Sequence, residues 1–211
     1  ASLGVKPITV ESNSETDFAP NIDSLISKGC NPIVTVGFAL SAATLTAAKA
    51  NPDVDFILID DAADADFDGK VDLPNTEPLL FNTAQAAFLA GYASASYSKT
   101  GIVATWGGMN FPTVTIFMDG FAQGVAYYNQ KKSKTVKVLG YDLASPDTAT
   151  FTGGFEANDV AKTTAQNFID QGADVLMPVG GPIFQSAGVA IIDSKKDIAL
   201  VGVDADLYET F

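Results

Sequence analysis

The stretch Val175-Leu176-Met177-Pro178-Val179-Gly180-Gly181 decides how the rest of the chain is interpreted. Five consecutive apolar residues that end at a glycine pair are typical of a short strand buried on both faces, as strands of parallel sheets are. The segment Phe56-Ile57-Leu58-Ile59, which is followed by Asp60 and Asp61, has the same character. Sequence of helical period lies on both sides of the first stretch and on the amino-terminal side of the second. The two stretches therefore predict an α/β fold in which parallel strands alternate with crossover helices.

The same alternation continues along all 211 residues. Short apolar runs predict strands at residues 7–10, 33–36, 56–59, 79–81, 102–105, 136–139, 175–179 and 200–203. Longer periodic stretches predict helices at residues 18–28, 41–50, 83–97, 112–129, 159–171 and 184–193. The polar stretch Tyr97-Ser98-Lys99-Thr100-Gly101 is the best candidate for a boundary. We therefore expect two doubly wound parallel-sheet lobes, residues 1–99 and residues 100–211, each within the usual size of a domain.

Composition argues against several classes of function. The 25 acidic residues outnumber the 12 basic residues and give a net charge of -13, which repels the phosphates of nucleic acids and an anionic membrane surface. The chain has no histidine and one cysteine, Cys30, so it lacks the commonest general base and zinc ligand and cannot form an intrachain disulfide. The sequence contains no run of 18 apolar residues, so we expect no segment that spans a membrane. We therefore expect no catalytic function, no cofactor and no nucleic-acid partner.

The residues that follow the predicted strands are the candidates for a binding site, because ligands of open α/β sheets lie beyond the carboxyl ends of the strands. These residues are Gly37, Phe38, Asp60, Asp61, Asn82, Trp106, Gly107, Gly108, Met109, Tyr141, Asp142, Gly180, Gly181 and Asp204. Glycines let a ligand approach the backbone, aromatic side chains offer a flat apolar face, and carboxylates accept hydrogen bonds from hydroxyls. No phosphate-binding glycine motif is present. The set therefore favours a neutral, hydroxylated ligand that contains a ring.

Several short motifs follow one another in a distinctive order. They include Asn51-Pro52-Asp53-Val54-Asp55-Phe56, Gly107-Gly108-Met109-Asn110-Phe111-Pro112, Asp119-Gly120-Phe121-Ala122-Gln123-Gly124, Thr152-Gly153-Gly154-Phe155 and Val201-Gly202-Val203-Asp204-Ala205-Asp206. Each motif is short, but their order and spacing cover nearly the whole chain. In this order the chain resembles the basic membrane protein family of bacterial ABC-transporter substrate-binding lipoproteins, whose best-understood members are purine nucleoside receptors.

The resemblance implies a type I periplasmic-binding-protein fold, a nucleoside held in the cleft between the lobes, and an ABC-transporter permease as partner. It implies that Phe155 stacks on the nucleobase and that the Asp204 carboxylate takes the ribose hydroxyls. Further cleft positions of the family match Gly37, Phe38, Asp60, Met109 and Gly180. The implied location is extracytoplasmic, with a lipid anchor in the full-length precursor that is absent from this chain.

The chain also departs from the family pattern at both ends. Family members open with a further strand and a second stacking aromatic residue before the segment that matches Ala1. They continue past the segment that matches Phe211 and return to the first lobe, with a lysine that helps to hold the sugar. We therefore expect a chain truncated at both ends. Two alternatives stay open, a nucleoside-acting hydrolase and the ligand-sensing domain of a regulator, because one fold hosts many functions.

Two charged stretches lie outside this set. The segment from Asp64 to Asp72 follows the first half of an EF-hand calcium loop, but Asn75 stands where the bidentate glutamate belongs. We interpret it as a solvated surface loop in preference to a metal site. The run Lys131-Lys132-Ser133-Lys134 predicts a cationic helix end that interacts favourably with the helix dipole.

Overall fold

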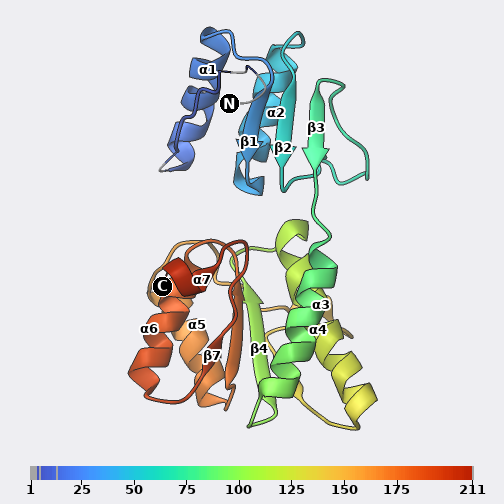
Figure 1. Cartoon of the computed structure of the whole chain (residues 1–211), viewed down its shortest axis with the longest axis vertical. Coiled ribbons are helices and arrows are strands. Elements are labelled where there is room, and N and C mark those ends of the chain that lie inside the picture. The colour runs from blue at the N-terminus through green and yellow to red at the C-terminus, as the bar shows by residue number, and fades with distance from the viewer. Residues whose placement is uncertain (1–3, 5, 13, 211) are drawn as a thin grey trace. The chain divides into compact units, whose positions relative to one another are not determined.

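A computed structural model describes residues 4, 6–12 and 14–210 of the chain. The chain divides into two compact units, Ala1–Phe81 and Asn82–Phe211. Each unit contains a parallel sheet together with helices (Figure 1). The predicted α/β class with parallel sheets is therefore confirmed.

The first unit is built on a three-stranded sheet. It contains η1 (Glu15–Asp17), α1 (Phe18–Ser27), β1 (Ile33–Val36), η2 (Phe38–Leu40), α2 (Ser41–Ala50), β2 (Phe56–Ile59) and β3 (Thr76–Leu79). The strands are parallel in the order β1-β2-β3. Ile33, Phe56 and Leu58 point to the side of α1 and α2, where they form a core with Ile22 and Leu45.

The other face of this sheet is open. Along β1, Ile33 and Thr35 are buried, whereas Val34 and Val36 are 48% and 65% exposed. Val34 pairs with Ile57 across the sheet, and Ile57 is only half-buried. The expectation that β2 is buried on both faces is therefore wrong, because the helices of this unit cover a single face.

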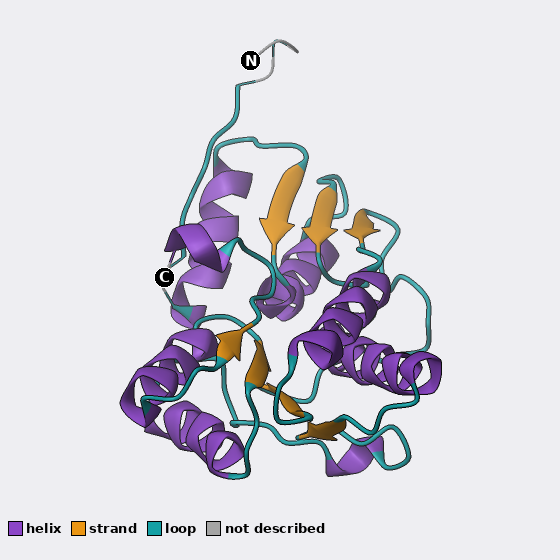
Figure 2. Cartoon of the chain, turned by 60° about the horizontal axis from the view of Figure 1, so that its bottom comes forward, coloured by secondary structure: helices purple, strands orange, loops and turns teal. Residues whose placement is uncertain are grey.

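The second unit has a four-stranded parallel sheet in the order β5-β4-β6-β7. Its elements are α3 (Thr83–Tyr97), β4 (Ile102–Gly107), α4 (Pro112–Lys132), β5 (Lys137–Leu139), η3 (Pro146–Thr148), α5 (Asp159–Asp170), β6 (Val175–Val179), α6 (Ile183–Ser194), β7 (Ala199–Leu200) and α7 (Leu207–Thr210). The pair α3 and α4 and the pair α5 and α6 lie on opposite faces of this sheet (Figure 2). All five residues of β6 are buried, as its continuous apolar sequence predicts.

The core between this sheet and α5 and α6 centres on the single tryptophan. Trp106 is fully buried with Leu176 and Ile169, and its ring lies 5.2 Å from that of Phe168 between centroids. Within the described residues the indole N–H of Trp106 has no hydrogen-bond partner. Trp106 therefore belongs to the core of the second unit.

Helices α3 and α4 approach each other closely through glycines. A Cβ atom on Gly91 would overlap the backbone oxygen of Phe121, and one on Gly124 would overlap that of Phe88. This packing joins α3 to the second unit, so the compact units divide before α3. The predicted lobe boundary between residues 99 and 100 stays a prediction.

Most predicted elements agree with the structure to within a few residues, and three strands differ. Residues 7–10 form no strand and are exposed. The strand predicted at 79–81 is β3, which begins at Thr76 because Thr76 pairs with Phe56. The strand predicted at 200–203 is β7, which is limited to Ala199–Leu200 because only these residues pair with β6.

Candidate ligand-binding site

The carboxyl ends of β4 and β6 form a glycine-rich edge in the second unit. The Gly108 N–H donates to the Val179 carbonyl at 3.0 Å. The segment Thr150–Gly154 runs beside the end of β4, with a parallel bridge between Gly107 and Phe151. The Thr152 N–H donates to the Gly107 carbonyl at 3.0 Å, and the Gly153 N–H donates to the Gly108 carbonyl at 2.9 Å. These bonds fix the backbone immediately before Phe155.

The Phe155 ring rests against this edge. A Cβ atom on Gly180 would lie 2.5 Å from Phe155 Cδ1, and a Cβ atom on Gly108 would overlap the same atom. Gly180 has φ of 123°, a conformation that other residues rarely adopt. Only glycine at both positions therefore leaves room for the ring. The structure thus brings together Phe155 and Gly180, two of the predicted site residues.

A second aromatic residue, Phe111, accompanies Phe155. The two rings are nearly parallel, with an interplanar angle of 18° and 6.3 Å between centroids, within the range of aromatic pairs. Phe111 is the N-cap of α4, next to Pro112, and it follows Met109, which is 39% exposed. Phe111 is absent from the predicted set. Its place between the end of β4 and the proline that starts α4 is the signal in the sequence that would have identified it.

Asp204 follows β7, the neighbour of β6 in the sheet. Its backbone is left-handed, with φ of 65°, a conformation in which aspartate is more frequent than most residues. The residue as a whole is exposed, yet desolvation by the surrounding protein atoms raises the pKa of its carboxyl group. Asp204 therefore lies on the same edge of the sheet as Gly180, and its contact with the sugar stays a prediction.

In the first unit, the predicted site residues again follow the strands. Gly37 has φ of 101°, and its N–H donates to the Ile59 carbonyl at 2.9 Å. Phe38, which begins η2, is half-buried. Asp60 has φ of 68°, and its N–H donates to the Leu79 carbonyl at 2.9 Å. Gly37, Phe38 and Asp60 thus share the carboxyl edge of this unit's own sheet.

Asp61, next to Asp60, has a structural role. One of its carboxylate oxygens accepts hydrogen bonds from Ser41 Oγ and from the Ala63 N–H, both at 2.8 Å. The carboxylate therefore ties the start of α2 to the loop after β2.

The acidic loop between β2 and β3 is open to solvent. Its residues 65–72 are exposed, in agreement with the interpretation as a surface loop. One oxygen each of Asp64, Asp66 and Asp72 lies within 4.8 Å of the others. The Asp64 carboxylate also accepts hydrogen bonds from the N–H groups of Asp68 and Gly69. These bonds help to close the turn, together with those from the Ala65 N–H to Asp72 and from the Asp68 N–H to Asp66.

The lysine run ends α4 as the sequence predicts. The helix ends at Lys132, and Ser133 adopts the left-handed conformation at its C-cap.

Among the helices of the described residues, none is long and apolar enough to cross a membrane.

Comparisons with known proteins place these features in a family context. The family described as "ABC transporter substrate-binding protein PnrA-like" matches residues 1–210. The ABC transporter nucleoside-binding protein BmpA of Lactococcus lactis is 29% identical over 204 residues, which cover 93% of this chain and 52% of that protein. An uncharacterized lipoprotein of Pyrococcus horikoshii is 31% identical over 199 residues, covering 92% of this chain and 44% of that protein.

A solved structure shows the same fold. An ABC transporter solute-binding protein from Aeropyrum pernix matches with a TM-score of 0.69 and 23% identity, covering 90% of this chain and 50% of that one. The chain thus spans about half the length of each of these three proteins. The predicted periplasmic-binding-protein type of fold agrees with this likeness.

Proposed function

The chain belongs to the family of PnrA-like ABC transporter substrate-binding proteins, and we propose that it forms part of a receptor for nucleosides. The observation that carries the proposal is the Phe155 ring, which rests against Gly108 and Gly180 at the carboxyl edge of the second sheet. A ring held by backbone atoms keeps its orientation when a ligand arrives, so little conformational entropy is lost on binding. Phe155 as a whole is half-buried.

The residue types around Phe155 suit a base linked to a sugar. A nucleobase stacks on an aromatic ring with about 1–3 kcal/mol, as measured for nucleic-acid platforms. The Asp204 carboxylate, on the same edge, is suited to accept hydrogen bonds from two ribose hydroxyls. Met109, next to the start of α4, adds a flexible apolar contact. Gly37, Phe38 and Asp60 of the first unit are proposed as further ligand contacts.

The proposed activity is reversible binding without turnover. The receptor would work outside the cytoplasm and deliver its ligand to an ABC-transporter permease. The relatives named as lipoprotein and as nucleoside-binding transporter component support this assignment. The proposal also accounts for a composition without histidine, because a binding protein needs no general base.

Titration calorimetry of the full-length protein with nucleosides, free nucleobases, sugars and amino acids tests this proposal. Phe155→Ala should weaken binding of both nucleosides and free bases by about 1–3 kcal/mol, because the stacking platform is lost. Phe67→Ala is the matched control, since Phe67 is 69% exposed in the acidic loop. Heat with sugars or amino acids alone would refute the nucleoside assignment, and an unchanged affinity of Phe155→Ala would remove Phe155 from the site.

A second variant separates recognition of the sugar from recognition of the base. Asp204→Asn should weaken binding of nucleosides and leave binding of free nucleobases unchanged, because only nucleosides donate ribose hydroxyls to the carboxylate. Equal losses for both ligand classes would assign Asp204 a structural role.

A further inference from the structure

The lysines of this acidic chain are unevenly distributed. Residues 82–141 hold one carboxylate, Asp119, and five lysines, Lys99, Lys131, Lys132, Lys134 and Lys137. This segment has a net charge of +4, whereas the rest of the chain has -17, which together give the -13 of the whole. The negative net charge of the whole chain therefore does not apply to residues 82–141. An anion can be attracted to this segment although the chain as a whole repels it.

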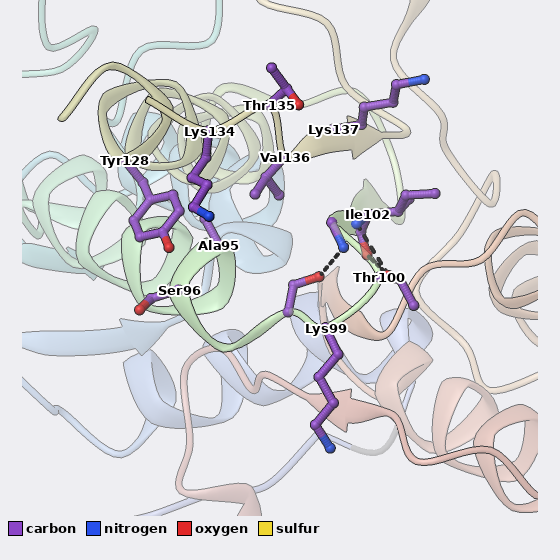
Figure 3. A pocket seen from close by; sticks show the side chains of 12 residues that line it. Ala95, Ser96, Lys99, Thr100, Ile102, Tyr128, Lys134, Thr135, Val136 and Lys137 are labelled. Atoms are coloured by element: carbon purple, nitrogen blue, oxygen red, sulfur yellow. Dashed lines mark hydrogen bonds between the residues drawn. The ribbon is translucent and has the colours of Figure 1, made fainter. Parts of the chain in front are cut away.

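Three of these lysines line a groove at the amino-terminal edge of the second unit's sheet (Figure 3). The groove has a volume of about 650 Å³ and lies where α3 and α4 end and where β4 and β5 begin. Its polar lining residues are Ser96, Ser98, Lys99, Thr100, Tyr128, Lys134, Thr135 and Lys137. It lies at the opposite end of the strands from Gly108 and Gly180, so it is distinct from the proposed nucleoside site.

The lysines differ in their surroundings. Lys134 points into the groove beside Tyr128, whereas Lys99 and Lys137 project from its rim (Figure 3). Lys99 is paired with Asp197, with 2.7 Å between Nζ and Oδ2. Over the described part of the chain, neither Lys134 nor Lys137 has a carboxylate within ion-pairing distance. Two positive charges at the groove are therefore uncompensated.

Hydroxyl groups line the groove, and one carboxylate holds the turn beside it. Among the described residues, the hydroxyls of Ser96 and Thr135 make no hydrogen bond with the protein. Asp174, which is 8% exposed, lies beneath the turn at Lys99 and Thr100. Its carboxylate accepts hydrogen bonds from Ser98 Oγ at 2.5 Å and from the N–H groups of Lys99 and Thr100 at 2.6 and 2.9 Å. This carboxylate therefore fixes the turn at Lys99 and Thr100, two residues that line the groove.

Lysine and hydroxyl donors from several elements line the groove, and Lys134 points into it (Figure 3). Ser96 comes from α3, Lys134 and Thr135 from the turn after α4, and Lys137 from β5. A phosphate offers acceptor oxygens in several directions, and lysine binds it as a flexible point charge. We propose that this groove binds a phosphate group, supplied either by a soluble phosphate ester or by the headgroup of an anionic phospholipid.

Titration of the chain with inorganic phosphate and with glycerol phosphate, followed by amide NMR, tests the proposal. The amides of Lys134, Thr135 and Lys137 should shift, while those of Gly108 and Gly180 should not. The double variant K134Q/K137Q should weaken binding at least about tenfold, because it removes both uncompensated charges. Added salt should weaken binding by the unsubstituted chain.

The matched control is K28Q/K49Q, which changes the net charge equally in the first unit at two exposed lysines. This variant should bind as the unsubstituted chain does. The proposal is overturned if neither phosphate compound shifts the groove amides, if K134Q/K137Q binds normally, or if the control variant loses binding to the same extent.

Flotation with phosphatidylcholine vesicles, with and without phosphatidylglycerol, distinguishes the two sources of the phosphate. Flotation that requires phosphatidylglycerol and is lost in K134Q/K137Q assigns the groove to a lipid headgroup. Binding of glycerol phosphate without flotation assigns it to a soluble ester. An absence of both would overturn the proposal.

Discussion

The strands β2 and β6 have similar apolar sequences and different surroundings. All five residues of β6 are buried, because α3 and α4 cover one face of its sheet and α5 and α6 cover the other. In β2 only Phe56 and Leu58 are buried, because α1 and α2 cover one face. The comparison shows that a continuous apolar run predicts a strand whose two faces can both be buried. It does not indicate which faces the neighbouring helices cover.

The largest expected effect is at Leu176 in β6. Leu176→Ala should lower the free energy of unfolding by about 2–5 kcal/mol, because the side chain is fully buried and leaves a cavity. Val36→Ala, at a residue of β1 that is 65% exposed, should cost about 0.5 kcal/mol or less. Urea titrations followed by far-UV circular dichroism compare the two variants. Similar costs would contradict the difference between the two sheets.

A smaller effect is expected where α3 meets α4. Gly91→Ala should destabilise the second unit by about 1–3 kcal/mol, because the added Cβ would overlap the Phe121 carbonyl oxygen. Gln85→Ala, at an exposed position of the same helix, is the control and should change stability by less than about 0.5 kcal/mol. Because Trp106 is the single tryptophan, its fluorescence reports unfolding of the second unit alone. A stabilising Gly91→Ala would show that the helices can separate without cost.

The smallest expected effect concerns pH. Burial by itself would raise the pKa of Asp174, but hydrogen bonds from Ser98, Thr100 and Lys99 outweigh it and lower the pKa below its usual value. A carboxyl group with a lowered pKa in the folded state stabilises the protein above its unfolded pKa, near 4, and loses this contribution as the pH falls through the folded value. Asp174→Asn should therefore cost about 1 kcal/mol at neutral pH.

The pH dependence supplies the check on Asp174. The difference in stability between Asp174→Asn and the unsubstituted chain should shrink when the pH falls below about 4, as followed by Trp106 fluorescence in urea. A difference that stays constant from neutral to acidic pH would mean that the charge of Asp174 makes no contribution. The first unit, which does not contain Asp174, should show no corresponding change.

Much of this fold could be predicted from the sequence because its elements carry strong local signals. The helices at residues 41–50 and 83–97 and the strands at 33–36, 56–59 and 175–179 have the predicted bounds. Residues 7–10 have the apolar character of a strand, but a strand also requires a partner, and sequence pattern does not supply one. The start of β3 at Thr76 likewise depends on its register with β2.

The candidate site could be predicted only in part. The rule that ligands lie beyond the strand ends selects Gly180 and Asp204 without any structure. It does not show that Phe155 rests against Gly108 and Gly180, or that Phe111 lies parallel to it, because these contacts join segments more than 20 residues apart. It also selects both Asp60 and Asp61, and it does not show that the Asp61 carboxylate accepts hydrogen bonds from Ser41 and Ala63.

Asp60 and Asp204 have left-handed backbones, so the stability of the fold and the proposed ligand contacts of these residues make opposite demands on them. A residue other than glycine in this conformation costs on the order of 1 kcal/mol, so glycine at either position would tend to make the fold more robust. A laboratory selection for survival at high temperature alone would therefore drift toward glycine at both positions and discard the two carboxylates. Melting temperature and nucleoside affinity, measured together on such survivors, would show whether the gain in robustness comes at the expense of the receptor.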